Sequence, residues 1–193
     1  RAMGWSLAYL PISAHDSRDF EEKVDALRVL GALGANITRP YKHDANTVCG
    51  ERSDVARAIG AVNTLVFRSD GIIAGDNTDG PGMLRLLRDR DPAELEVVRI
   101  LGAGGSARAV AWAAREAGAE RVEVAARRAE QAQSVAEPFG AIATSLEAGE
   151  PPTLVVSTLP ADPRLAGDAI DRWLDVSRRP ALIDLAYNEP GAP

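Results

Sequence analysis

The first half of the chain mixes strand-like and helix-like hydrophobic patterns. Leu7–Ile12 is a short apolar run that predicts a strand, and apolar residues at helical spacing around Asp19 and Glu22 predict a helix that reaches Leu30. Asp91-Pro92 then breaks the pattern. This half predicts a mixed α/β unit with these further elements: a strand at Ala35–Thr38, a hairpin of Thr64–Phe67 and Ile72–Ala74, and a helix at Gly80–Asp89.

After Leu95 the pattern changes to strands that alternate with helices. Apolar runs predict strands at Val97–Leu101, Val122–Ala125, Thr153–Ser157 and Ala181–Leu185. Periodic apolar positions predict helices at Ala107–Ala117, Ala129–Glu137 and Asp168–Val176. This order is typical of a doubly wound parallel sheet of the Rossmann kind, so we expect two domains, residues 1–90 and 91–193.

Length and composition are those of a globular protein. The chain has 193 residues, of which 46% are hydrophobic and 26% charged. No run approaches the roughly 18 consecutive apolar residues of a membrane-spanning helix. Residues 1–10 lack an initiator Met and the regions of a signal peptide, so we expect the chain to be a piece of a longer protein.

Charge and rare residues narrow the function classes. The net charge is −6, which argues against broad adhesion to nucleic acid or to anionic lipid and favours a small ligand. The single cysteine, Cys49, can form neither an internal disulfide nor a zinc site, which favours a reducing cytoplasmic location and no metal. Only Lys23 and Lys42 supply a titratable amine.

A glycine-rich segment follows the Val97–Leu101 strand and opens a predicted helix. It fits the dinucleotide-binding pattern G-x-G-x-x-A in the strand-turn-helix context that the pattern requires. The glycines allow a tight turn and close approach of a pyrophosphate, and the helix N-terminus faces its negative charge. A ligand-free glycine-rich turn is the alternative. The predicted cofactor-binding residues are Gly102, Ala103, Gly104, Gly105, Ser106 and Ala107.

The end of the next strand bears on the choice of cofactor. Proteins that bind NAD place an acidic residue there, which bonds the ribose 2′-hydroxyl. This strand ends in Ala125-Ala126 and is followed by Arg127 and Arg128, whose guanidinium groups could bind a 2′-phosphate. The pattern favours NADP, although two adjacent arginines also occur as a solvated basic pair.

Polar residues of the first half fit a hydroxylated ligand. Asn36 and Thr38 alternate along a predicted strand and so share one face, with the amine of Lys42 just beyond the strand end. Asn63 and Asp79 lie in two further segments rich in Asn and Thr. Each of these residues could instead serve a turn or a helix cap.

Together these segments resemble the NADP-dependent shikimate dehydrogenase family. The family's N-V-T-x-P-x-K, G-A-V-N-T-L and G-x-N-T-D-G stretches match residues 36–42, 60–65 and 75–80 in the same order. Its G-A-G-G-S/A-A-R loop matches residues 102–108, its N-R-T phosphate clamp aligns with residues 126–128, and a D-x-x-Y-N stretch matches residues 184–188.

The resemblance implies reduction of 3-dehydroshikimate to shikimate by NADPH, a step of aromatic amino-acid biosynthesis. In that mechanism hydride passes between the nicotinamide and a ring carbon, Lys42 exchanges a proton with the substrate oxygen, and Asp79 holds the amine. Residues 1–90 would form the substrate-binding domain and residues 91–193 the NADP-binding domain. By resemblance the further site residues are Asn36, Thr38, Asn63, Asp79 and Tyr187 for the hydroxylated ring, and Ser157 and Thr158 for the cofactor.

The sequence also departs from the family pattern. The early Ser-x-Ser substrate clamp and a late Gln-bearing helix have no counterpart, so both ends are expected to be incomplete. Ala126 replaces the Asn of the phosphate clamp, and Ser157-Thr158-Leu159 replaces an Asn-Ala-Thr-like stretch.

Three alternatives remain open at this point. One is a dehydrogenase of the same fold that acts on quinate or an aminated shikimate analogue. Another is an NADP-binding protein without turnover, and a third is a protein similar to methylene-folate dehydrogenases. We expect no nucleic-acid or membrane partner, and a monomer or a homodimer.

Overall fold

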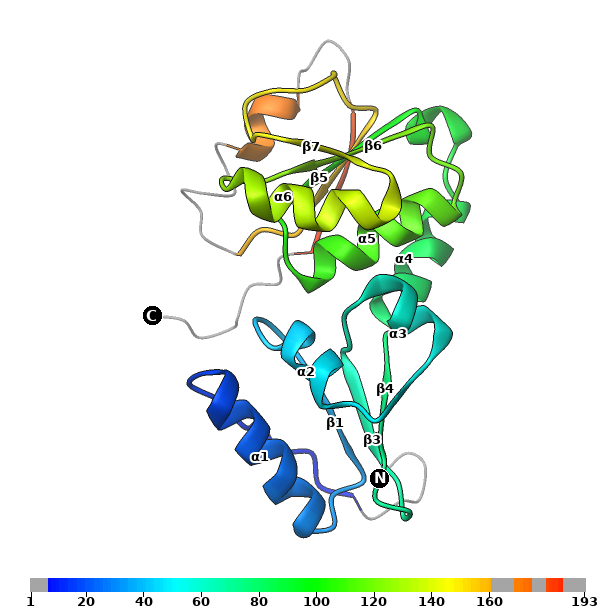
Figure 1. Ribbon diagram of the computed structural model, residues 1–193. Helices are drawn as coiled ribbons and strands as arrows, with labels where there is room; N and C mark the ends of the chain where they lie inside the picture. Colours follow the sequence, from blue (N-terminus) through cyan, green and yellow to red (C-terminus); the bar gives the residue numbers. More distant parts are fainter. Residues whose placement is uncertain (1–6, 161–168, 175–179, 186–193) are drawn as a thin grey trace.

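The computed structural model describes residues 7–160, 169–174 and 180–185, which form two separate sheets (Figure 1). The first sheet has the strand order β1-β3-β4-β2. Its strands are β1 (Gly34–Asn36), β2 (Glu51–Arg52), β3 (Thr64–Phe67) and β4 (Ile73–Asp76). Strands β1, β3 and β4 pair antiparallel, whereas β2 pairs parallel to β4.

Three helices accompany this sheet: α1 (Ser17–Val29), α2 (Lys42–Val48) and α3 (Asp54–Ile59). Helix α1 begins at a cap in which the side chain of Asp16 accepts a hydrogen bond from the amide of Asp19. Its buried residues Phe20 and Val24 pack in one core with Leu65 of β3. The first half of the chain therefore builds its own hydrophobic core.

The second sheet is parallel throughout, with the strand order β7-β6-β5-β8-β9. Its strands are β5 (Val97–Leu101), β6 (Arg121–Ala125), β7 (Ile142–Thr144), β8 (Leu154–Ser157) and β9 (Ala181–Asp184). The helices around it are α4 (Asp79–Arg88), α5 (Gly105–Glu116) and α6 (Ala129–Ala136), with 3-10 turns at Pro92–Leu95 and Glu137–Phe139. Residues 169–173 are also helical.

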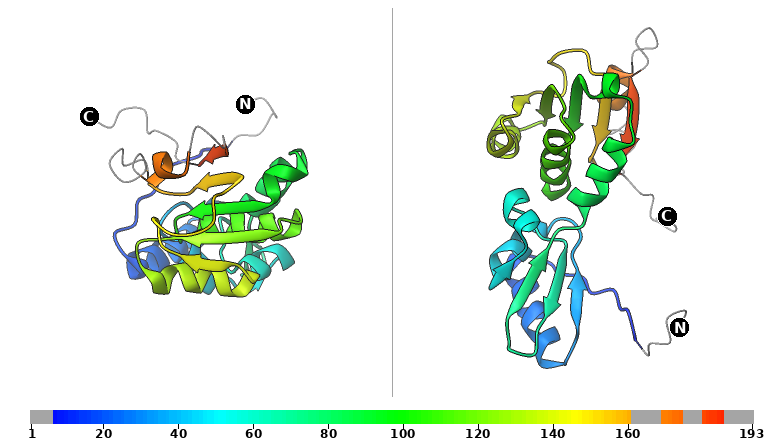
Figure 2. Two further views of the ribbon diagram at one scale, coloured as in Figure 1. Left: turned by 90° about the horizontal axis from the view of Figure 1, so that it is seen from above. Right: turned by 90° about the vertical axis from the view of Figure 1, so that its right-hand side faces the viewer.

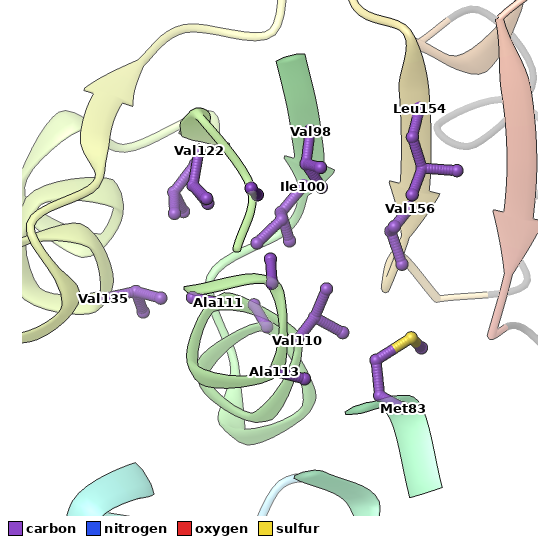
Figure 3. Close-up of a cluster of buried hydrophobic side chains, with 14 of the residues drawn as sticks. Met83, Val98, Ile100, Val110, Ala111, Ala113, Val122, Val135, Leu154 and Val156 are labelled. Carbon is purple, nitrogen blue, oxygen red and sulfur yellow. The ribbon is translucent and has the colours of Figure 1, made fainter. Parts of the chain in front are cut away.

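Apolar side chains cover both faces of this sheet. Leu154 and Val156 of β8 belong to one core cluster with Met83 of α4 and Val110 of α5, as Figure 3 shows. Val155, between them, packs on the other face with Ile170. Alternate residues of a strand point to opposite faces, so a strand buried on both sides is apolar at most of its positions. This burial explains the apolar runs of the sequence, which Arg99 of β5 and Glu123 of β6 interrupt.

Helix α4 connects the two sheets, which lie one beyond the other along the long axis of the molecule (Figure 2). Its buried residues Met83 and Leu87 belong to the core of the second sheet. On α5, Arg108 donates a hydrogen bond from Nε to the carbonyl of Ile59, at 2.7 Å, and so joins this helix to α3. Burial lowers the pKa of Arg108 from its ordinary value. These contacts fix the two sheets relative to each other.

The structure confirms the predicted fold class, the hairpin, the alternating second half and every helix predicted within the described residues, with ends shifted by a few residues. The strand predicted at Leu7–Ile12 is wrong: this segment has no regular structure, and Tyr9 and Leu10 are exposed. Its backbone finds no partner strand within the described part of the chain, and a strand requires one. Helices α2 and α3 and strands β2 and β7 were not predicted from the sequence.

Among the described residues, no helix is both long and apolar enough to cross a membrane. The division of the chain at residue 90 stays a prediction.

Candidate active site

Lys42 is the first residue of α2, and its side chain lies between the two sheets. Its Nζ atom donates hydrogen bonds to Oδ2 of Asp79, at 2.8 Å, and to Oγ of Ser106, at 3.0 Å. Its backbone carbonyl accepts a hydrogen bond from the amide of Val62 at 2.8 Å, which fixes the start of α2 against the first sheet. The side chain is only 14% exposed. Lys42 is therefore a well-positioned amine that contacts groups from both halves of the chain.

Asp79 is the first residue of α4, and the preceding residues fix its position. The amide group of Asn63 donates to Oγ1 of Thr78 at 2.9 Å, and its Oδ1 atom accepts from the amide of Thr78 at 3.0 Å. Asn77 donates to the carbonyl of Ala61 and accepts from the amide of Gly80. Because Asn63 and Asn77 satisfy the backbone here, the carboxylate of Asp79 meets Lys42 instead of serving as a cap.

A cavity of about 530 Å³ opens beside this pair. We call it the lysine cavity. It is lined by Ile37, Thr38, Arg39, Lys42, Thr78, Asp79, Gly82, Met83, Leu86, Ser106, Ala109, Val110, Thr158, Leu159 and Leu185. Hydroxyl groups and apolar side chains surround one amine and one carboxylate, an arrangement that suits a small hydroxylated molecule.

Five residues predicted for the site line this cavity: Thr38, Lys42, Asp79, Ser106 and Thr158. The structure does not bring Asn36 and Asn63 to it. Asn36 is exposed and accepts a hydrogen bond from the hydroxyl of Tyr9 at 3.3 Å, on a different groove. Asn63 is buried and its amide serves Thr78, as described above. Tyr187 lies outside the described residues.

A second cavity, of about 430 Å³, adjoins the first at the glycine-rich loop. We call it the loop cavity. It shares Arg39, Lys42, Ser106, Thr158 and Leu159 with the lysine cavity. Its other lining residues are Pro40, Gly102, Ala103, Gly104, Gly105, Ala126, Arg127, Arg128, Gln131, Leu146 and Pro160. The amine of Lys42 thus lies where the two cavities meet.

The glycines of the loop are needed for different physical reasons. Gly102 has a φ of 113°, and a side chain there would place Cβ 2.3 Å from Oγ1 of Thr158. Gly104 caps α5, and the space next to its Cα is open, so a ligand can approach the backbone closely. Ala107 is fully buried in the core of the second sheet, as expected from its place in the pattern.

The residues after β6 and β8 complete the loop cavity. Arg127 and Arg128 are exposed, and within the described structure their guanidinium groups make no hydrogen bond or ion pair. Thr158 donates from Oγ1 to the carbonyl of Leu101 at 2.9 Å. Ser157 does not line either cavity; it is fully buried, and its hydroxyl has no hydrogen-bond partner in the described part of the molecule.

Comparison with known proteins identifies the family. Residues 1–65 match the family model of the shikimate dehydrogenase substrate binding domain. A shikimate dehydrogenase (NADP(+)) of Caulobacter vibrioides is 43% identical over 142 residues, which cover 72% of this chain and 50% of that protein. The one from Acidiphilium cryptum is 40% identical over 186 residues, which cover 95% of this chain and 63% of that protein. The chain belongs to the shikimate dehydrogenase family.

Solved structures agree with this assignment. Shikimate 5-dehydrogenase from Thermus thermophilus, in complex with NADP(H) and shikimate, is 35% identical with a TM-score of 0.63 over 75% of this chain and 54% of its own. Quinate dehydrogenase from Corynebacterium glutamicum, in complex with NAD, is 30% identical with a TM-score of 0.70 over 86% of this chain and 64% of its own. This family member spans about half the length of the first curated relative it matches.

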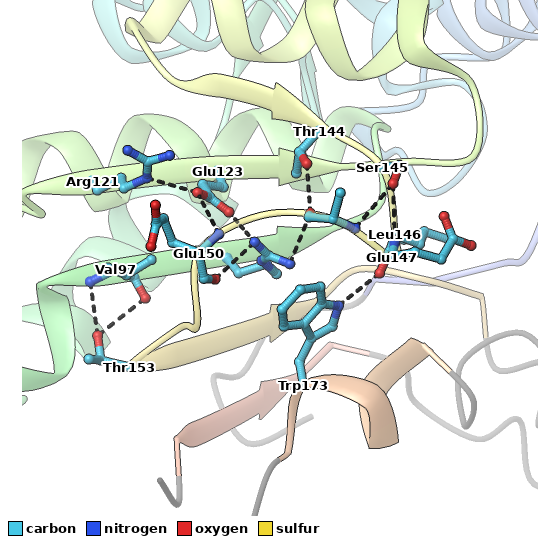
Figure 4. A network of polar contacts seen from close by, with 12 residues as sticks. Val97, Arg121, Glu123, Thr144, Ser145, Leu146, Glu147, Glu150, Thr153 and Trp173 are labelled. Atoms are coloured by element: carbon cyan, nitrogen blue, oxygen red, sulfur yellow. Dashed lines mark hydrogen bonds and ion pairs between the residues drawn. The ribbon is translucent and has the colours of Figure 1, made fainter.

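A buried polar network behind the loop cavity of this shikimate dehydrogenase family member was missed by the sequence analysis (Figure 4). Arg99 of β5 and Glu123 of β6 form an ion pair between two fully buried side chains. The guanidinium of Arg99 also donates to the carbonyl of Glu150 at 3.0 Å and lies 3.5 Å from the ring centre of Trp173. Burial lowers the pKa of Arg99, and its hydrogen bond with Glu123 opposes that shift.

This network supports one wall of the loop cavity. Trp173 donates from Nε1 to the carbonyl of Leu146 at 2.8 Å, and Leu146 lines the loop cavity. These residues belong to no sequence motif. A charged residue within an apolar strand can be seen in the sequence, but the residue with which it pairs depends on the fold.

Among the described residues, no group of three or more histidine, cysteine or acidic side chains could hold a metal ion.

Proposed function

We propose that this chain carries the active site of an NADP-dependent shikimate dehydrogenase, which reduces 3-dehydroshikimate to shikimate. The observation that carries this proposal is the Lys42–Asp79 pair at the junction of two cavities. The lining of the lysine cavity suits a hydroxylated ring, and the loop cavity contains the glycine-rich loop of a dinucleotide site. The names of the relatives and of the Thermus thermophilus structure support the same activity.

The residues of the loop cavity fit NADP. The open approach to Gly104 suits a pyrophosphate at the N-terminus of α5. Among the described residues, the guanidinium groups of Arg127 and Arg128 have no partner where the 2′-phosphate of NADP would lie, and no acidic residue lines this cavity. When bound, NADPH supplies a hydride to the substrate ring.

Lys42 moves the proton in the proposed reaction. As the carbonyl carbon of 3-dehydroshikimate gains a hydride, the carbonyl oxygen gains a proton from Nζ of Lys42, and the reverse reaction returns it. Asp79 and Ser106 hold Nζ from two sides, so the amine keeps its direction toward the cavity. Thr38, also in this wall, provides a hydroxyl for the ring substituents.

In this proposal residues 1–90 bind the substrate and residues 91–193 bind NADP. Helix α4 belongs to the first of these ranges, although its residues Met83 and Leu87 pack in the core of the second sheet. The roles of Asn36, Asn63, Ser157 and Tyr187 remain predictions from the family pattern. So do a cytoplasmic location and a monomeric or dimeric state.

Quinate is the second candidate substrate, because the quinate dehydrogenase of Corynebacterium glutamicum matches the fold over most of this chain. Shikimate and quinate should each be tested with NADP+ and with NAD+, by the rate of cofactor reduction. NADPH binding should be measured by calorimetry on the same sample, shown to be folded by a cooperative thermal transition. Faster turnover of shikimate with NADP+ than of quinate supports the proposal, whereas NADPH binding without turnover of either substrate indicates a binding protein.

A further inference from the structure

Arg39 contributes a positive charge to the lysine cavity that the proposed reaction does not use. It lies in the turn between β1 and α2, three residues before Lys42, and lines both cavities. Its side chain is exposed, and within the described residues its guanidinium makes no hydrogen bond or ion pair. This group is therefore available to a ligand.

The charges of the lysine cavity do not cancel. Among the described residues, its charged lining residues are Arg39, Lys42 and Asp79. The amine of Lys42 and the carboxylate of Asp79 neutralise each other at 2.8 Å, so that within this part of the chain the charge of Arg39 has no partner. A cavity with one unpaired cation selects an anion over a neutral molecule of the same shape.

The remaining lining residues define what kind of anion fits. Four residues that carry hydroxyl groups line this cavity: Thr38, Thr78, Ser106 and Thr158. A planar guanidinium binds a carboxylate through two parallel hydrogen bonds. We propose that Arg39 recognises the carboxylate of a hydroxylated ring acid, and is thus a specificity-determining residue of this enzyme. The inference rests on the proposed function, because shikimate is such an acid.

A phosphate group of the cofactor is the competing anion, because Arg39 also borders the loop cavity. That cavity already holds the guanidinium groups of Arg127 and Arg128, which have no partner in the described part of the chain, together with the helix N-terminus of α5. In the lysine cavity, by contrast, Arg39 is the one unpaired cation among the described lining residues. The substrate carboxylate is therefore the better-matched ligand.

The test compares shikimate with its neutral methyl ester. The unchanged protein should prefer the acid, by KM in turnover and by the dissociation constant in calorimetry. Arg39→Leu should raise the KM and the dissociation constant for the acid by roughly tenfold or more, because a hydrogen bond to a charged group is lost. The same constants for the ester and for NADP+ should stay nearly unchanged. Arg39→Lys should restore part of the preference. Arg85→Leu is the matched control, because Arg85 is exposed on α4 and lines neither cavity.

The outcomes separate the inference from the function on which it rests. If Arg39→Leu weakens binding of the acid and of the ester equally and also raises KM for NADP+, Arg39 binds a phosphate of the cofactor. That result would overturn the inference. An acid preference that is unchanged in Arg39→Leu would overturn it as well. Failure of the unchanged protein to oxidise shikimate would contradict the proposed function, while the calorimetric comparison of acid and ester still decides the role of Arg39.

Discussion

Gly105 and Lys42 are in contact across the two halves of the chain. A Cβ atom added at Gly105 would lie 2.9 Å from Cβ of Lys42 and 3.2 Å from its Cδ. The helix N-terminus of α5 thus packs directly on the stem of the lysine whose amine meets Asp79. A glycine is required here by the position of the proposed catalytic residue, in addition to any contact with a cofactor.

Gly105→Ala should therefore misplace the amine. Methylene groups of Lys42 must move by a few tenths of an ångström or more, and small displacements of a catalytic group can cost on the order of 100-fold in rate. We expect kcat with shikimate to fall by roughly tenfold to 100-fold, with little change in the thermal transition. Gly50→Ala is the control, because its added Cβ meets only ordinary contacts, at 3.5 Å or more. Equal turnover of the two variants would show that this contact does not position Lys42.

Arg127→Ala should weaken binding of NADPH much more than binding of NADH. The 2′-phosphate is the group that distinguishes the two cofactors, and loss of a hydrogen bond to a charged group costs about 1.5–3 kcal/mol. That corresponds to roughly a tenfold to 100-fold rise in the dissociation constant for NADPH, measured by calorimetry. If the constant changes by less than about twofold in Arg127→Ala and also in Arg128→Ala, these arginines do not bind the phosphate.

Removal of Arg99 should strongly destabilise the second sheet. Arg99→Ala leaves the buried carboxylate of Glu123 with one partner fewer, and breaking a buried pair in this way costs about 3–5 kcal/mol. Replacing both residues, as Arg99→Met with Glu123→Leu, should cost less, because no buried charge then remains. The free energies of unfolding in urea check this order. A double variant less stable than Arg99→Ala would contradict it.

The second half of the fold was predictable because its strands are buried on both faces. Val97–Leu101 is a continuous apolar run apart from Arg99, and β5 spans those same residues. The segment Leu7–Ile12 has the same local pattern but no described partner strand, so a prediction from hydrophobicity alone fails there. Helix α3 carried readable signals that the sequence analysis did not use: Ser53 caps its start, and Gly60 ends it with a φ of 70°.

The candidate site was predictable by residue type and motif, but most of its contacts were not. The family resemblance implied that Asp79 holds the amine of Lys42, and the fold brings these residues, 37 positions apart, together. Ser106 was expected in the cofactor loop, whereas its hydroxyl also accepts a hydrogen bond from Lys42. Asn63 has a polar side chain suited to a ligand, yet that side chain satisfies the backbone before α4. Whether such a side chain bonds a ligand or the backbone depends on the tertiary structure.

In the proposed reaction, Lys42 transfers a proton at the junction of the two cavities. The direct test of this role is kcat for shikimate oxidation by Lys42→Met, because general acid–base assistance contributes roughly 100-fold to 10,000-fold. Lys23→Met is the control. Lys23 donates hydrogen bonds to the carbonyl of Ser13 and to Oδ2 of Asp19, and it lines neither cavity.

We predict that kcat falls by roughly that factor in Lys42→Met while KM for shikimate changes much less. In Lys23→Met, kcat should stay close to that of the unchanged protein, and the loss of its partly exposed ion pair should change the stability little. Equal kcat values for folded samples of the two variants would contradict the claim.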